Sequence, residues 1–124
     1  MSYRVVFAAA VLLDAYGCAV PPSPTDPRLV IAPDLPLVAE APSVTTSAGM
    51  MRVTLRLVNG APQDLPVLTI TDWLDEQGRP ISSLMSAPMR MTVPRYGDAV
   101  MDRLAPRGTV TGFHIRIEPD WAAF

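Results

Sequence analysis

Residues 51–57 read MRVTLRL, and this short stretch decides the fold class of the chain. Apolar side chains stand at every odd position and arginine or threonine at every even one, which is the period of a half-buried β-strand. The same alternation recurs at residues 89–93 (MRMTV) and 113–117 (FHIRI). Residues 67–74 (VLTITDWL) are apolar on both faces, which predicts a central strand covered on both sides.

Further strand candidates and turn sequences fill most of the remaining chain. Residues 29–32, 37–39 and 99–104 are weaker strand candidates. Turn signals separate the strands at residues 59–60 (NG), 75–78 (DEQG), 96–98 (YGD) and 106–108 (PRG). Residues 82–86 (SSLMS) have room for one helical turn only.

Many short strands separated by turns favour a sandwich. We predict that residues 28–124 form an all-β domain, a small antiparallel two-sheet sandwich of immunoglobulin-like type. A small open barrel is the alternative.

The composition limits the classes of function. At 124 residues with 49% apolar side chains, the chain is one small globular domain with appendages. The formal net charge of −2 offers no electrostatic footprint for nucleic acid. The single cysteine excludes an internal disulfide and a Cys-rich metal site. No cofactor is expected.

Residues 1–17 have the three parts of an export signal. Arg4 supplies a positively charged n-region, residues 5–13 (VVFAAAVLL) form a uniformly apolar h-region, and residues 15–17 (AYG) end in a small residue, as a cleavage region does. The apolar run would span only about 14 Å as a helix, which is too short to cross a bilayer. We expect this signal peptide to be removed, with an N-terminal helix packed into the domain as the alternative.

The cysteine stands directly after this segment. Residues 15–18 (AYGC) resemble a bacterial lipobox, which implies cleavage before Cys18 and acylation of its thiol. Ordinary signal peptidase would cut the same bond without adding lipid, because Ala15 and Gly17 satisfy its small-x-small rule. In Gram-negative lipoproteins aspartate after the cysteine favours the inner membrane, so Ala19 implies the outer membrane. Residues 18–27 are then a lipidated cysteine and a Pro-rich tether, of which residues 19–27 reach about 28 Å.

The domain itself resembles the YcfL-like family of small Gram-negative lipoproteins over residues 49–118. The matching features are a strand over 53–58 ending at Asn59, the sequence WLD at 73–75, Gly78, Val93-Pro94, and FHIRI at 113–117. This chain has TIT at 69–71 where the family usually has more aromatic residues. The resemblance implies a periplasmic β-sandwich of poorly defined function.

No group of residues has the pattern of a catalytic site, so we expect no enzyme. His114, the only histidine, lies on the polar side of its strand and is expected at the surface. Asp72, Asp75 and Glu76 are the nearest approach to a calcium-type site, and the alternative is that Asp75 caps a turn. Trp73 is expected in the core, with an exposed binding anchor as the alternative.

Surface arginines and an apolar tail are the candidate binding residues. The arginines fall on the polar faces of predicted strands and would form one patch for an acidic partner or glycan if those faces coincide. The alternative is that they are dispersed and paired with local carboxylates. The tail PDWAAF either covers a sandwich edge or docks into a partner. The possible partner-binding residues are Arg52, Arg56, Arg90, Arg116, Trp121 and Phe124.

These observations predict an outer-membrane-anchored periplasmic lipoprotein. Its partners would be the membrane, through acylated Cys18, and another periplasmic or outer-membrane protein, with no nucleic acid. It would act as a non-catalytic protein-binding or structural subunit of a cell-envelope assembly, by analogy with lipoproteins of secretion or motor machines. The alternative is a periplasmic binding module for a small ligand or glycan fragment, which needs an apolar cleft with convergent polar groups.

Overall fold

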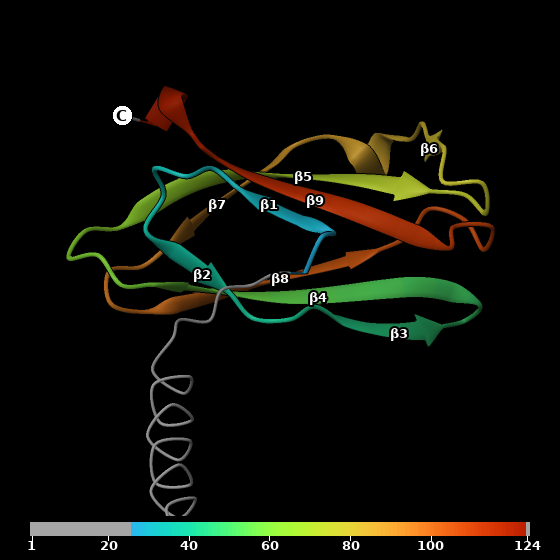
Figure 1. The fold of residues 1–124 in the computed structure, drawn as a ribbon, viewed down its shortest axis with the longest axis horizontal. Helices are drawn as coiled ribbons and strands as arrows, with labels where there is room; N and C mark the ends of the chain where they lie inside the picture. The colour runs from blue at the N-terminus through green and yellow to red at the C-terminus, as the bar shows by residue number, and fades with distance from the viewer. Residues whose placement is uncertain (1–25, 124) are drawn as a thin grey trace, which may run out of the picture.

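The computed structural model describes residues 26–123, which form two β-sheets packed face to face (Figure 1). The strands are β1 (Leu29–Ile31), β2 (Leu37–Ala39), β3 (Ser43–Ser47), β4 (Met50–Asn59), β5 (Leu65–Leu74), β6 (Pro80–Ile81), β7 (Met89–Val93), β8 (Asp98–Leu104) and β9 (Gly112–Pro119). Two single 3-10 turns, η1 (Leu84–Ser86) and η2 (Trp121–Ala123), complete the described elements.

The five-stranded sheet is built around β5. Strand β9 pairs with one side of β5 along eight residues, and β7 and β6 share the other side at opposite ends. Strand β1 lies outside β9 and runs parallel to it, in register Leu29 with Ile115. All the other strand pairs described are antiparallel, so this one pair departs from the predicted antiparallel pattern.

The four-stranded sheet is built around β4. Strand β8 pairs with one side of β4, and β2 and β3 follow one another along the other side. Strands β3 and β4 form a hairpin whose two turn residues, Ala48 and Gly49, both have positive φ angles of 53° and 79°. This is the type I′ geometry that matches the twist of paired strands.

The core lies between the sheets and follows from the alternation in the sequence. Successive side chains of a strand point to opposite faces, so the odd-numbered residues of β4, β5 and β9 all point inward. The largest fully buried side chains include Trp73, Phe113, Leu55, Leu57 and Met101. Trp73 is thus a core residue, as predicted.

The two separate sheets confirm the predicted sandwich and exclude the barrel. All seven predicted strands are present, and η1 is the predicted single turn within residues 82–86. Strands β3 and β6 were not predicted. The outer face of β5 also differs from the prediction, because Leu68 and Ile70 are only half-buried there and no element within residues 26–123 forms a layer over them.

An ion pair lies just before β1, at the start of the described residues. The two carboxylate oxygens of Asp26 accept hydrogen bonds from Nε and Nη2 of Arg28 at 2.9 and 2.7 Å. The guanidinium of Arg28 lies 4.8 Å from the centre of the Phe113 ring. Asp26 is thereby joined to Arg28, which directly precedes β1 and contacts β9.

Several predictions concern residues outside those that the structure describes. The signal peptide (1–17), Cys18 and the tether as far as residue 25 are among them, and so is Phe124. Within residues 26–123, no helix is long and apolar enough to cross a membrane.

Candidate interaction surfaces

The sandwich separates the four arginines that would have formed one patch only if the polar faces of their strands coincided. Arg52 and Arg56 lie on β4, on the outer face of the four-stranded sheet. Arg90 and Arg116 lie on β7 and β9, on the outer face of the other sheet. The polar faces of these strands do not coincide, because the strands belong to different sheets whose outer faces point in opposite directions. The single arginine-rich patch is therefore not formed.

On the outer face of the four-stranded sheet, Arg52 and Arg56 are each neutralised by carboxylates that flank β4. Arg56 lies between Glu40 and Asp98, and its Nη1 and Nε each donate a hydrogen bond of 2.5 Å to them. Arg52 binds Asp102 through Nε and Nη2, at 3.0 and 2.8 Å. These hydrogen bonds raise the pKa of both arginines, and that from Arg52 lowers the pKa of Asp102.

The same face exposes aliphatic side chains between the ion pairs. Val38 of β2 and Val100 of β8 are 53% and 56% exposed, on either side of β4. This face, which we call the β4 face, therefore combines neutralised charges with small apolar side chains. It offers no uncompensated cation to an acidic ligand.

On the five-stranded sheet, the ion pairs are longer. Arg116 Nε lies 3.9 Å from Asp72, and its Nη1 lies 3.6 Å from Glu118. His114 pairs in register with Asp72 and is exposed, which confirms its predicted surface position. The arginines of this sheet are thus also dispersed and paired with local carboxylates.

Arg90 and Trp121, two of the predicted binding residues, are brought to one corner by Asp120. Asp120 is 4% exposed, and its carboxylate lies 3.5 Å from Arg90 Nε and accepts a 3.2 Å hydrogen bond from the backbone N–H of Ala122. The backbone N–H of Asp120 is bound to the Pro66 carbonyl, which fixes the chain against β5. Trp121, the next residue, is 70% exposed. We call Arg90, Asp120 and Trp121 the C-terminal corner.

The acidic turn is a structural feature. Oδ1 of Asp75 accepts hydrogen bonds of 2.9 Å from the backbone N–H groups of Gln77 and Arg79. These bonds, led by that from Arg79, lower the pKa of Asp75. Asp75 therefore caps the turn, as its alternative interpretation predicted. No group of three or more carboxylate, histidine or cysteine side chains suited to a metal occurs in the described part of the chain.

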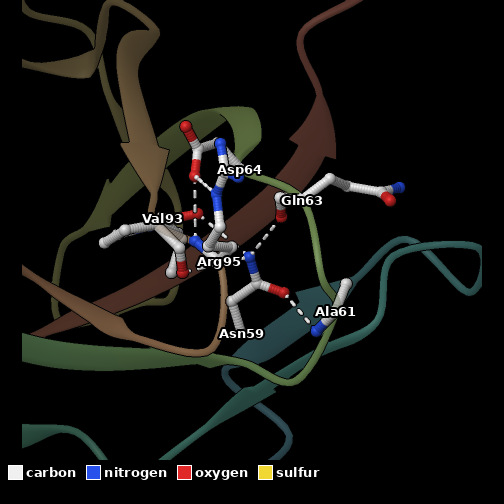
Figure 2. A network of polar contacts seen from close by, with 7 residues as sticks. Asn59, Ala61, Gln63, Asp64, Val93 and Arg95 are labelled. Carbon is white, nitrogen blue, oxygen red and sulfur yellow. Dashed lines mark hydrogen bonds and ion pairs between the residues drawn. The ribbon is translucent and has the colours of Figure 1, made fainter.

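Asn59, predicted at the end of a strand and the start of a turn, has a role that its sequence context does not reveal. The side chain is 1% exposed, and Figure 2 shows it between two loops at one end of the sandwich. Its Nδ2 donates to the carbonyls of Gln63, Val93 and Pro94 at 2.9, 3.0 and 3.2 Å. Its Oδ1 accepts from the N–H of Ala61 at 2.8 Å.

Two hydrogen bonds between Arg95 and Asp64 also join these loops. Arg95 donates from its backbone N–H and from Nε to Oδ1 of Asp64, at 3.0 and 3.2 Å (Figure 2). These hydrogen bonds lower the pKa of Asp64, with the backbone bond as the larger cause. Asn59 and Asp64 therefore connect the β4–β5 loop to the β7–β8 loop, and thereby one sheet to the other. The sequence signals here were the Asn-Gly dipeptide and the places of Asn59 and Val93-Pro94 in the family resemblance, and none of these reports burial or contact.

Comparison with known proteins identifies the fold alone. No family model matches the chain, and no curated protein matches it. The solved structure of cj0090 from Campylobacter jejuni is similar at 15% identity with a TM-score of 0.66, over 77% of this chain and 100% of that one. A DUF1425 family member from Shewanella sp. pv-4 is similar at 15% identity with a TM-score of 0.61, over 66% of this chain and 76% of that one. The chain thus shares its sandwich fold with cj0090 and with a DUF1425 protein.

Proposed function

We propose that this protein is a periplasmic lipoprotein of the YcfL type, anchored in the outer membrane through Cys18, whose sandwich binds another cell-envelope protein. The exposed tryptophan of the C-terminal corner is the observation that carries the binding role. Tryptophan and arginine are the residues most enriched at the energetic centres of protein interfaces. The buried Asp120 holds both at one place on the surface.

The filled interior also favours binding at the surface. Large side chains from both sheets occupy the core, and no pocket is present within residues 26–123. A carrier of a small ligand needs a concave apolar site with a few polar groups. The ligand-binding alternative therefore has less support than binding of a protein.

The short segment between Cys18 and the sandwich would keep the sandwich close to the membrane. Asp26 pairs with Arg28 just before β1, and residues 19–25 lie between it and Cys18. In an extended polyproline conformation this segment would reach roughly 22 Å. Acyl chains on Cys18 would give stable anchoring, since two hydrophobic signals already suffice.

The anchor is tested by intact mass spectrometry of the protein isolated from membranes of a Gram-negative host. We expect a chain that begins at Cys18 and carries the added mass of acyl groups, and a Cys18→Ser variant that is found in the soluble fraction. A mature chain that begins with unmodified Cys18 would refute the lipid anchor and leave the binding role standing.

The binding role is tested by photo-crosslinking in intact cells from the exposed position Ala122, next to Trp121. We expect one discrete crosslinked protein, lost when Trp121→Ala is added. The matched control carries the crosslinker at Leu84, which is 93% exposed on η1. The proposal is wrong if Ala122 gives no product, or gives the same product as Leu84.

A further inference from the structure

Strand β3 is an exposed edge of the four-stranded sheet. It pairs only with β4 among the described strands, and Figure 1 shows no strand beyond it. Its five residues read SVTTS, and Ser43 to Thr46 are all exposed. An unpaired strand edge presents backbone donors and acceptors that another strand can bind.

The other edges carry the features that prevent such pairing. Charged side chains, prolines and short length are the usual protections of an edge strand. Strands β1 and β2 have only three residues each, and prolines lie close to them: Pro27 and Pro33 flank β1, and Pro36 precedes β2. Strand β6 starts with Pro80. Strand β7 carries Arg90 and ends before Pro94, and β8 carries three charged residues, Asp98, Asp102 and Arg103. Strand β3 has no charge and no proline within its five residues, and Pro42 directly precedes it.

We propose that β3 pairs antiparallel with β3 of a second copy of this chain, across a two-fold axis at Thr45. The sequence SVTTS is nearly symmetric about its central residue, so self-pairing places Ser43 opposite Ser47 and Val44 opposite Thr46. A closed two-fold interface needs such a self-complementary surface. The two four-stranded sheets would join into one continuous sheet.

The backbone of β3 has the register that this axis requires. The two-residue turn makes Ser47 and Met50 a hydrogen-bonded pair, so Ser43, Thr45 and Ser47 bond to β4. The peptide groups of Val44 and Thr46 consequently point away from β4. With the axis at Thr45, Val44 of each copy faces Thr46 of the other, and each such pair exchanges two backbone hydrogen bonds.

The side chains around the axis are compatible with a second copy. Threonine opposite threonine is a favourable cross-strand pair, and Val44, now 41% exposed, would be covered by Thr46 of the other chain. Arg52 stands opposite Thr45 on β4, and Asp102 already neutralises it. The two Arg52 side chains would therefore approach each other as neutralised ion pairs.

The proposal is tested by the mass in solution of the full-length chain, measured by light scattering at high protein concentration. We expect twice the chain mass for the wild type and the single mass for Thr46→Lys, which places a charge at the edge. Thr92→Lys is the matched control, an exposed threonine on edge strand β7, and it should stay dimeric. Thermal unfolding of both variants checks their folding. A monomeric wild type, or a dimeric T46K, would overturn the proposal.

A disulfide at the axis gives a second measurement that does not depend on a charge. In a Cys18→Ala background, Thr45→Cys supplies the sole thiol, and facing residues of a non-hydrogen-bonded pair are close enough for a disulfide. We expect mild oxidation to convert most T45C chains into covalent dimers. Val100→Cys, which is exposed on edge strand β8, should remain largely monomeric. Equal crosslinking of the two variants would contradict pairing through β3.

Discussion

At the scale of single residues, one buried amide connects the two sheets at their loop end. Asn59 uses both amide hydrogens and its oxygen on backbone groups of two loops. Alternative side chains of similar size cannot do this, because the site presents three carbonyls and one N–H in a fixed arrangement. Leaving buried polar groups unpaired costs more free energy than a typical hydrogen bond contributes.

We therefore expect Asn59→Ala to lower the free energy of unfolding by about 2–4 kcal/mol, because it leaves the Ala61 N–H and buried carbonyls unpaired. Asn59→Asp should be at least as damaging at neutral pH, since a carboxylate would face the carbonyls that the amide now donates to. Urea denaturation measures both. Gln63→Ala is the control and should change stability by less than about 0.5 kcal/mol, because this exposed residue contributes only its carbonyl. Similar losses in all three variants would contradict this role.

The carboxylate at the domain boundary gives a prediction about pH. Hydrogen bonds from the Arg28 side chain, and then from its backbone, lower the pKa of Asp26 from 3.8 to about 2. A lowered folded-state pKa stabilises the fold above pH 3.8, and this contribution is lost as the pH falls towards 2. Because Arg28 is partly exposed, the Asp26 carboxylate should contribute no more than about 1 kcal/mol to the free energy of unfolding.

Comparing Asp26→Asn with the wild type by thermal unfolding at several pH values tests this. The wild type should be the more stable protein at neutral pH, and the difference should shrink between pH 3.8 and 2. A difference that stays constant over this range would show that the carboxylate charge is not its source.

Local chemistry made some residue roles predictable and left others hidden. Trp73 and His114 follow from alternation within their own strands, and the Asp75 cap follows from a turn sequence. The role of Asn59 depends on Val93 and Pro94, which are more than thirty residues away along the chain. No pattern within a single strand reports such a contact.

At the scale of elements, the β3–β4 hairpin contains a conformation that its sequence suits poorly. Ala48 has a φ of 53°, in the left-handed region where a β-carbon clashes with the backbone. Gly49, at 79°, has no such penalty. Type I′ turns favour asparagine or glycine at the first of these positions.

Ala48→Gly and Ala48→Asn should each raise the free energy of unfolding, by about 0.5–1 kcal/mol, because they relieve this strain. Gly49→Ala is the control and should be destabilising, although no atom lies within 4 Å of the added β-carbon. Urea denaturation of the three variants provides the measurement. A stabilised Gly49→Ala would contradict the assignment of the turn.

Alternation identified strands with one apolar face and missed strands without one. Strand β3 consists of serine and threonine around a single valine, so its sequence has no apolar period. Strand β6 has two residues, which is too short for any period. The parallel pairing of β1 with β9 was not predictable, because alternation reports which face is buried and not which neighbour a strand has.

At the scale of the whole molecule, the buried core of the described residues lies between the two sheets. Ile115 of β9 is fully buried there, whereas Ile70 of the neighbouring strand β5 points outward and is half-buried. Ile115→Ala should cost about 3–4 kcal/mol of stability, because it removes apolar contacts and leaves a cavity.

The matched variant Ile70→Ala should cost about 1 kcal/mol, since its site is open to solvent and no closed cavity forms. Denaturation by urea measures the difference. Equal costs would mean that a further layer covers the outer face of the five-stranded sheet.

The number and spacing of strands were enough to predict a sandwich, but not to assign strands to sheets. Arg52 and Arg90 have the same local pattern, apolar neighbours on either side, yet they lie on opposite faces of the molecule. The distribution of strands between sheets depends on long-range packing of the core. The sequence could therefore suggest an arginine patch, but only the fold could show whether the arginines share one face.

The parallel pairing of β1 with β9 has a mechanical consequence. The chain enters the domain at the start of β1 and leaves it after the end of β9, so a pull between Asp26 and Trp121 draws these two strands past each other along their axes. The hydrogen bonds that cross the pair, including those of Arg28 with Ile115 and of Ala32 with Ile117, then bear the load together. An antiparallel pair pulled from its open end would lose such bonds one at a time. A domain held at one end by a membrane and at the other by a partner would therefore resist tension by shear of this short pair.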